Sequence, residues 1–267
     1  MFKSILAVSE GGPDALMTFS LARRLAGIFD GTVDALHLPV GAIGGTISLH
    51  LATNRHRLET RARQSEQVFK EILGPLAGST YTAEIRVTPL EALVGMGRFS
   101  DILVLGRPGA DPENHDPDTV KTAIYECARA VMIAPPDAVA GPFESVIVAW
   151  NASFQATRAV EYAMPFLAKA SKITILVVGK QPDEVGASFL ARNFQRHGLK
   201  TVINAVDPGT VSGRARGRAL LDYAHGTDAD LLVMGAYGGG QLKSFLGVGG
   251  ATGKVLSSCR IPVLMAH

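Results

Sequence analysis

Cysteine is scarce in this sequence, and long apolar runs are absent. The 267 residues include two cysteines, Cys127 and Cys259, which excludes a framework of disulfide bonds and favours a reducing compartment. No apolar stretch approaches the roughly 20 residues that span a bilayer. The first fifteen residues, MFKSILAVSEGGPDA, contain one lysine, a short apolar run and two acids, unlike a secretion signal or a transit peptide. We therefore expect a cytoplasmic protein with no membrane partner.

An excess of charge is also missing. The 26 basic and 24 acidic side chains give a formal net charge of +2, so bulk charge attracts neither nucleic acid nor an anionic membrane. The basic residues between 55 and 70 are interleaved with glutamates, as on a solvated helix face. No Ser/His/Asp set, carboxylate pair or Cys/His cluster stands out. We expect no nucleic-acid partner, no catalytic residues and no metal site.

Three segments of the first half recur in the second half, each pair aligned without a gap. They are an opening apolar strand, a strand that begins after an acidic residue and ends in G-x-x-G, and a closing strand that follows a cysteine. The paired ranges are 2–10 with 143–151, 100–109 with 229–238, and 127–134 with 259–266. Three matches in the same order indicate a duplication.

The stretch PPDAVAGP, residues 135–142, separates the two copies and is typical of a linker. We predict a first domain over residues 1–136, a linker over 137–142 and a second domain over 143–267. The hydrophobic content of 47% is sufficient for two cores.

Short apolar runs alternate with longer helical patterns in each half, which predicts βαβ units around a parallel sheet. Ligands of such sheets bind at the carboxyl ends of the strands, near the point where the strand order reverses. The predicted strands are 3–8, 32–38, 83–87, 101–106 and 130–134 in the first half, and 144–150, 172–178, 200–205, 229–234 and 262–266 in the second.

The segment GAYGGGQLKSFLGVGGATGKVL, residues 235–256, ends like a phosphate-binding loop but has the wrong spacing. Val248 stands where the first glycine of that motif belongs, and Val255 follows the Gly253-Lys254 pair in place of Ser or Thr. A glycine-rich loop that runs into a helix can still gather backbone N–H groups around an anion.

The chain resembles the universal stress protein family in its tandem, two-domain form. The resemblance rests on the turns Glu10-Gly11-Gly12 and Asn151-Ala152-Ser153, on the D-x-L-V-x-G-x-x-G element, and on the ending ATGKVLSSCRIPVL. It implies two flavodoxin-like or Rossmann-like α/β domains, each with a five-stranded parallel sheet of order 3-2-1-4-5 flanked by helices. It also implies that the domains pair through their last strands, 130–134 and 261–266. Whether the protein forms a homodimer, or has a protein partner, stays open.

Nucleotide-binding members of this family resemble one another in a loop written G-x-x-G, nine residues, then G-Ser/Thr, which surrounds the ribose and phosphates of ATP. This chain departs from that pattern twice: ten residues separate Gly238 from Gly249, and Gly250 stands in the place of the hydroxyl residue. ATP or another adenine nucleotide is the implied ligand, and the need for Mg²⁺ stays open. The residues that the resemblance assigns to the site are Asn151, Met234, Gly235, Gly238, Gly249, Gly250, Ala251 and Thr252.

The first half departs further, because its corresponding loop, 110–118, contains four acids, two prolines and no Gly-Ser/Thr pair. Acidic side chains repel phosphates and proline lacks an N–H donor, so we predict no nucleoside triphosphate there. The acids Asp111, Glu113, Asp116 and Asp118 form either a cation site or, as we favour, a solvated loop.

Several alternatives remain at this stage. The equivalent positions of Cys127 and Cys259 favour packing over a redox role, and His37 is interpreted as structural. Arg214, Arg216 and Arg218 precede a helix and either steer phosphate or form an exposed first turn. The principal hypothesis is a stress-linked adenine-nucleotide-binding protein, and the alternative is a scaffold of the same fold. ATP hydrolysis has the least support, because no general base is identifiable.

Overall fold

The computed structural model describes residues 1–12, 14–39, 51–83, 89–109, 115–137, 141–238 and 250–267. The chain divides into two compact units, Met1–Val139 and Ala140–His267.

The first unit is a parallel α/β sheet with the strand order β3-β2-β1-β4-β5. Apolar strands that are buried on both faces explain the continuous hydrophobic runs in the sequence. In chain order the elements are β1 Ser4–Ser9, α1 Asp14–Phe29, β2 Thr32–His37, α2 Leu51–Ile72, β3 Thr80–Ala83, α3 Pro89–Phe99, β4 Ile102–Leu105, α4 Pro117–Glu126 and β5 Ala130–Ile133.

The second unit repeats this plan with the order β8-β7-β6-β9-β10, again with parallel neighbours. Numbered within each unit, both sheets have the order 3-2-1-4-5, so the predicted fold is confirmed. The elements are β6 Ser145–Ala149, α5 Phe154–Leu167, β7 Lys172–Val178, the 3-10 helix η1 Asp183–Val185, α6 Ala187–Arg196, β8 Thr201–Val206, α7 Gly213–Gly226, β9 Leu231–Gly235, α8 Ala251–Ser258 and β10 Val263–Ala266.

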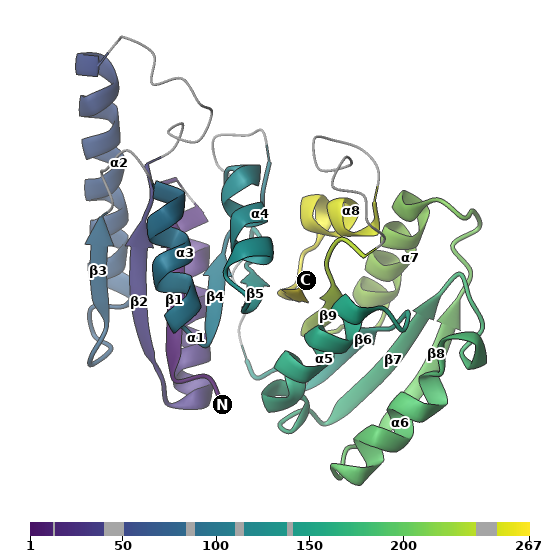
Figure 1. Ribbon diagram of the computed structural model, residues 1–267. Coiled ribbons are helices and arrows are strands. Elements are labelled where there is room, and N and C mark those ends of the chain that lie inside the picture. Colours follow the sequence, from purple (N-terminus) through teal and green to yellow (C-terminus); the bar gives the residue numbers. More distant parts are fainter. Residues whose placement is uncertain (13, 40–50, 84–88, 110–114, 138–140, 239–249) are drawn as a thin grey trace. The chain divides into compact units, whose positions relative to one another are not determined.

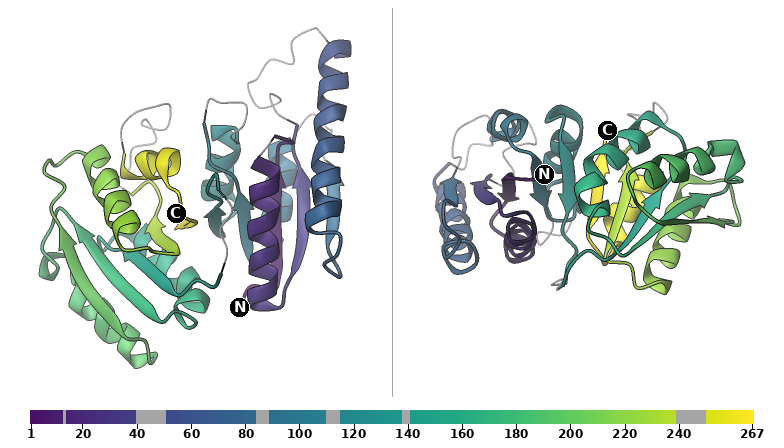
Figure 2. Two further views of the ribbon diagram at one scale, coloured as in Figure 1. Left: turned by 180° about the vertical axis from the view of Figure 1, so that it is seen from behind. Right: turned by 90° about the horizontal axis from the view of Figure 1, so that it is seen from below.

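Helices cover both faces of each sheet. In the first unit α1 and α2 lie on one face and α3 and α4 on the other, and in the second unit α5 and α6 lie opposite α7 and α8 (Figures 1 and 2). Right-handed crossovers require this division, because the connections step in one direction from the first strand and then return past it. The first turns of α7 and α8 therefore meet at the carboxyl ends of the central strands.

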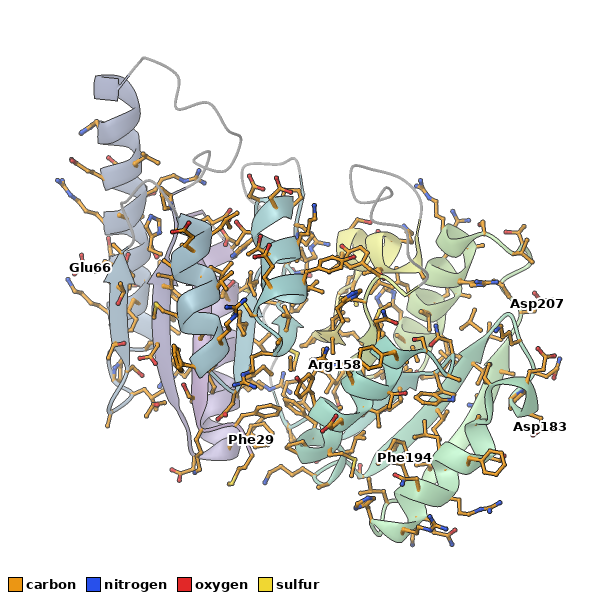
Figure 3. The ribbon with its side chains drawn as sticks, viewed as in Figure 1. Phe29, Glu66, Arg158, Asp183, Phe194 and Asp207 are labelled. Atoms are coloured by element: carbon orange, nitrogen blue, oxygen red, sulfur yellow. The ribbon has the colours of Figure 1, made fainter. Side chains whose placement is uncertain are left out.

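Equivalent residues of the two copies play equivalent parts in the cores. Phe2 packs edge to face on Phe29 with ring centroids 5.2 Å apart, and Phe143 packs on Phe166 in the same way at 5.3 Å. Figure 3 labels Phe29 and Phe194, both of them buried in the interior of their own unit.

The acidic residue before the fourth strand of each copy also has a matching role. Asp101 Oδ2 accepts hydrogen bonds from the backbone N–H groups of Lys3 and Ser4, and Asp230 Oδ2 accepts them from Glu144 and Ser145. Because the two copies have the same contacts, we assign a structural role to the acidic residue of the D-x-L-V pattern.

The third strand differs from its prediction. It was expected at 83–87, but β3 spans Thr80–Ala83, and residues 84–88 lie outside the described ranges. The prediction followed the apolar letters, whereas β3 is an edge strand whose side chains are mostly exposed, so its composition carries little hydrophobic signal.

No helix in the described part of the chain is long and apolar enough to cross a membrane. The domain boundaries at 136 and 143 and the pairing of 130–134 with 261–266 stay predictions.

Candidate functional site

The second unit contains a pocket of about 240 Å³ at the carboxyl ends of its central strands. The strands β6, β7 and β9 contribute its floor, and the first turns of α7 and α8 contribute its walls. This is the edge at which the strand order reverses, so the pocket lies where the fold class places ligands.

Seven of the eight residues assigned from the sequence line this pocket. Gly249 is the exception, because it lies outside the described residues. The seven are Asn151, Met234, Gly235, Gly238, Gly250, Ala251 and Thr252. The structure therefore brings together residues that are up to 101 positions apart, from Asn151 to Thr252.

Helix α8 opens into the pocket without a side-chain cap. Its N-cap residue is Gly250, whose backbone is extended and which has no side chain to accept a hydrogen bond from the first turn. The first N–H groups of a helix have no partner within the helix, and they carry the positive end of its dipole. The start of α8 is thus a donor surface that faces the pocket.

Two polar side chains in the first turns of α8 make hydrogen bonds within the protein. Thr252 Oγ1 accepts a hydrogen bond from the backbone N–H of Tyr237 at 3.1 Å, which joins the G-x-x-G turn to α8. Lys254 Nζ donates to Ser258 Oγ at 2.9 Å, one turn further along the helix. Lys254 therefore belongs to α8, and it does not line the pocket in the manner of a phosphate-loop lysine.

Asn151 starts the turn between β6 and α5. Its Oδ1 accepts a hydrogen bond from Ser153 N at 3.0 Å, and Ser153 Oγ then caps α5 by accepting one from Ala156 N at 3.2 Å. With Oδ1 engaged in this turn, Asn151 has its Nδ2 amide left as the donor it can offer a ligand.

Arg216 is the one charged side chain among the described residues that line the pocket. Arg214 and Arg218, from the same helix, instead line a neighbouring groove of about 580 Å³ together with Asp207 and Asp222. Of the three arginines singled out in the sequence, only the middle one faces the predicted site.

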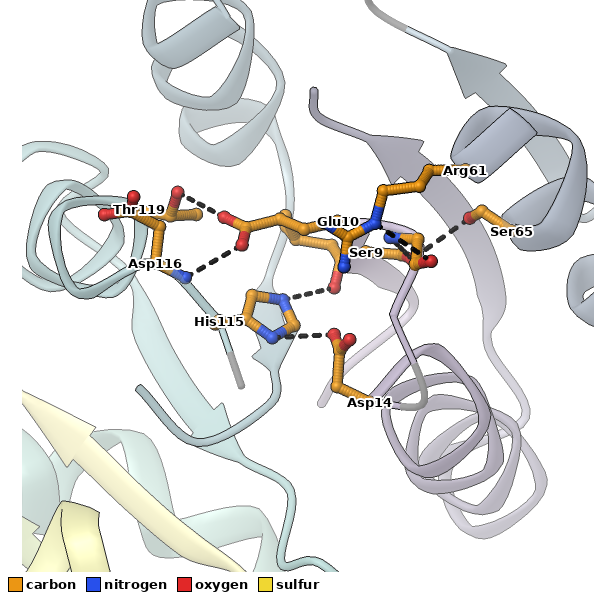
Figure 4. Close-up of polar contacts among 10 residues, drawn as sticks. Ser9, Glu10, Asp14, Arg61, Ser65, His115, Asp116 and Thr119 are labelled. Carbon is orange, nitrogen blue, oxygen red and sulfur yellow. Dashed lines mark hydrogen bonds and ion pairs between the residues drawn. The ribbon is translucent and has the colours of Figure 1, made fainter. Parts of the chain in front are cut away.

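The corresponding position in the first unit is filled by the chain itself. His115 is fully buried: its Nε2 donates to the carbonyl of Val8 at 2.9 Å, and its Nδ1 forms an ion pair with Asp14 Oδ2 at 2.8 Å (Figure 4). Gly106, the counterpart of Gly235, lies so close that a Cβ there would come within 2.6 Å of His115 Nδ1.

Glu10, the counterpart of Asn151, is also buried and turns toward α4. Its carboxylate accepts hydrogen bonds from Asp116 N at 2.8 Å and from Thr119 Oγ1 at 2.5 Å (Figure 4). A carboxylate of the protein thus occupies the start of α4, where an external anion would otherwise be favoured. Glu10 therefore serves an internal contact of the first unit.

Burial and charge shift the pKa values of this cluster. Burial would lower the pKa of His115, but the attraction of Asp14, assisted by Glu10, outweighs it and raises the pKa to about 9. Burial raises the pKa of Glu10 above its ordinary value, although His115 and the two hydrogen bonds act in the opposite direction. His115 is therefore an imidazolium at neutral pH, and both of its nitrogens donate.

We predict that the first unit loses stability as the pH rises toward 9 and beyond. The raised pKa of His115 means that its contribution is complete below pH 6.5 and disappears as the pH passes about 9. The shift corresponds to about 3 kcal/mol. Urea unfolding at pH 6.5 and 9.5, monitored through NMR signals of β1, measures the fall in the free energy of unfolding. The His115→Gln variant should show a smaller fall between the two pH values. Equal falls in both proteins would exclude His115 as the cause.

The acidic loop of the first unit does not form the predicted solvated run throughout. Asp116 caps α4, because its Oδ1 accepts a hydrogen bond from Asp118 N at 2.8 Å. Asp111 and Glu113 lie outside the described residues. Within the described ranges, no group of three or more His, Cys, Asp or Glu side chains is arranged to hold a metal ion.

The other candidates have structural surroundings. Burial, with a contribution from Arg61, lowers the pKa of His37 to about 4, so this side chain is neutral and buried at the end of β2. Cys127 and Cys259 are buried and are not joined in a disulfide bond, and burial raises the pKa of the Cys127 thiol to about 11.

Sequence reasoning missed the part played by His115. A histidine between two acids, in a loop without the glycines of its counterpart, was the available signal. The pattern could not show that His115 turns inward, because that depends on its contacts with Val8 and Asp14, which lie more than 100 positions away in the sequence.

Comparisons with known proteins agree with the fold. The model of the universal stress protein family matches residues 142–267. The chain is similar to a universal stress protein from Archaeoglobus fulgidus DSM 4304, with 15% identity over 98% of this chain and 97% of that chain and a TM-score of 0.73. It is also similar to a functionally unknown protein from Pseudomonas aeruginosa PAO1, with 15% identity over 98% and 92% and a TM-score of 0.53.

Identities this low establish a shared fold and nothing finer. No curated protein is similar in sequence to this chain. Because the family's sequence pattern covers residues 142–267, and because the first unit has the same strand order, the second unit belongs to the universal stress protein family and the first unit repeats its fold.

Proposed function

We propose that this chain is a stress-response protein whose second unit binds an adenine nucleotide, such as ATP. The observation that supports this most is the uncapped start of α8, which opens into a pocket lined by the assigned glycines and Asn151. Backbone N–H groups at a helix start bind phosphates without requiring a particular side chain. The missing hydroxyl at Gly250 is therefore compatible with nucleotide binding.

The pocket also has an apolar part suited to a base. Leu176, Val178 and Met234 line it near the strand ends, and the ring of Trp150 lies beside them with its indole N–H donating to the carbonyl of Val185 at 2.8 Å. A mostly apolar cleft with a few directed polar groups is typical of a small-molecule site.

Calorimetric titration with ATP, ADP and AMP, with and without Mg²⁺, tests the proposal. We expect heat of binding and a raised melting temperature in the presence of ligand, since a ligand that binds only the folded state stabilises it. Absence of binding at millimolar nucleotide would reject the proposal and leave the alternative, a scaffold of the same fold. Two features favour that alternative: Gly250 lacks the hydroxyl, and about 240 Å³ is below the roughly 300 Å³ at which ligand pockets usually begin.

The substitution Gly250→Ser should strengthen ATP binding. The backbone at Gly250 is extended, and the atom nearest to an added Cβ is Thr252 N at 4.0 Å, so a side chain fits without strain. One additional hydrogen bond to a charged phosphate should raise the affinity about three- to tenfold.

Gly250→Ala is the matched control for this change. It restricts the backbone in the same way and adds no hydroxyl, so the ratio of Ser to Ala affinities isolates the hydrogen bond. An alanine variant that binds ATP as tightly as the serine variant would contradict the predicted phosphate contact.

A further inference from the structure

We propose that Arg216 is the side chain that gives the second-unit pocket its selectivity for phosphate charge. The inference rests on the proposed nucleotide function and identifies which part of the ligand the pocket reads.

Arg216 lies where α7 packs against the start of α8. The next residue, Gly217, marks where α7 touches α8: a Cβ there would come within 2.8 Å of Ala251 O and of Lys254 Cβ. This close approach holds the first turn of α7 against the first turn of α8. Arg216 is therefore adjacent to the helix start that offers its free N–H groups to the pocket.

Arg216 also has a donor that no described residue uses. The Nε of Arg216 is buried and makes no hydrogen bond among the described residues. It lies beside Gly179 at the end of β7, where an added Cβ would be 3.4 Å away. A buried donor without a partner is costly, and such groups in folded proteins usually have an acceptor. A bound phosphate supplies one.

The described polar side chains of the pocket offer a ligand mainly hydrogen-bond donors. None of the described lining residues is Asp or Glu. The oxygens of Asn151, Ser153 and Thr252 each already accept a backbone hydrogen bond, which leaves their N–H or O–H groups for a ligand. Spare donors and one cation make this part of the pocket complementary to an anion, a charge that a nucleoside without phosphate does not supply.

The neighbouring arginines are not equivalent to Arg216. Arg218 lies in the adjoining groove with Asp207 and Asp222, where acidic side chains oppose an anionic ligand. This difference between two residues of one helix gives the experiment a matched control, Arg218→Gln.

The test compares three probes, ATP, adenosine and tripolyphosphate, by calorimetric titration of the full chain and two variants. We expect Arg216→Gln to weaken ATP and tripolyphosphate binding at least tenfold, with adenosine binding unchanged. Arg218→Gln should remain within twofold of the unmodified protein. Since Arg216 Nε has no partner to lose, the melting temperature of Arg216→Gln without ligand should be preserved.

Each outcome separates the inference from the function on which it rests. ATP binding that is equal in Arg216→Gln and the unmodified protein would overturn the inference and leave the nucleotide proposal standing. Equal losses for ATP and adenosine would place Arg216 at the base and also overturn it. If tripolyphosphate binding depends on Arg216 and ATP binds no more tightly than tripolyphosphate, the phosphate contact of Arg216 is supported. The proposed nucleotide-binding function is then rejected. No binding of any probe would overturn both.

Discussion

Replacing His115 by leucine should lower the free energy of unfolding of the first unit by about 3–5 kcal/mol at pH 7. His115 is fully buried, and the side chain of Asp14 is 6% exposed, so the substitution leaves a carboxylate inside the protein without its counter-charge. It also removes the donor to the carbonyl of Val8. Removal of one partner from a buried pair is far more harmful than replacement of both.

A double variant separates loss of charge from loss of shape. Asp14→Asn combined with His115→Leu removes the unpaired carboxylate, so it should recover a large part of the stability lost in the single variant. Urea unfolding of the full chain, followed through NMR signals of β1 and β4, assigns the change to the first unit. A single variant within 1 kcal/mol of the unmodified protein would show that the pair contributes little.

The internal contacts of the first unit also explain why its sequence departs from that of the second. The loop before α4 carries His115 and Asp116 where the other copy has glycines. Those side chains meet Glu10 and Asp14 from the start of the domain. Helix α2 contacts the turn that follows β1, because Ser65 Oγ donates a hydrogen bond to Ser9 Oγ at 3.0 Å (Figure 4). The acids predict that no nucleoside triphosphate binds there, and the structure adds that His115 and Glu10 make internal contacts at this position.

The sequence was sufficient to place most strands and to group residues that line one pocket, for a physical reason, whereas the strand order was implied by the family resemblance. Buried parallel strands need continuous apolar runs, and a turn that approaches another backbone closely needs glycine, so both features are visible as letters. Because the same pattern occurs in both halves of the chain, the strands of each half support the prediction of those in the other. Nine of the ten strands lie within two residues of their predicted ends, and the exposed edge strand β3 is the exception.

What the sequence could not predict depends on side-chain direction across elements. Arg214, Arg216 and Arg218 are alike as letters, yet one lines the pocket and two line the adjoining groove. That choice follows from the rotation of α7 about its axis, which the contact of Gly217 with Ala251 fixes. Such contacts between distant segments have no signature in a single sequence.

Gly235→Val should destabilise the second unit severely and abolish ligand binding. A Cβ at this position would come within 2.6 Å of Ala156 N and 2.8 Å of Gln155 C, which are backbone atoms of α5. Backbone within a helix cannot move aside as a flexible side chain can, so either β9 or the first turn of α5 must shift. Insertion of bulk into a closely packed site costs about 1–3 kcal/mol, and rigid neighbours place this case at or above the upper end.

The same shift would disturb residues that line the pocket. The first turn of α5 follows Ser153, whose oxygen caps it, and Asn151, whose side chain holds the turn. Gly226→Ala is the matched control, because Gly226 ends α7 in the same unit and an added Cβ there meets nothing within 4 Å. We expect that control to melt at or slightly above the temperature of the unmodified protein, since alanine favours a helix. If Gly235→Val melts like the control and keeps its affinity for ATP, then close approach to α5 is not the reason for glycine at this position.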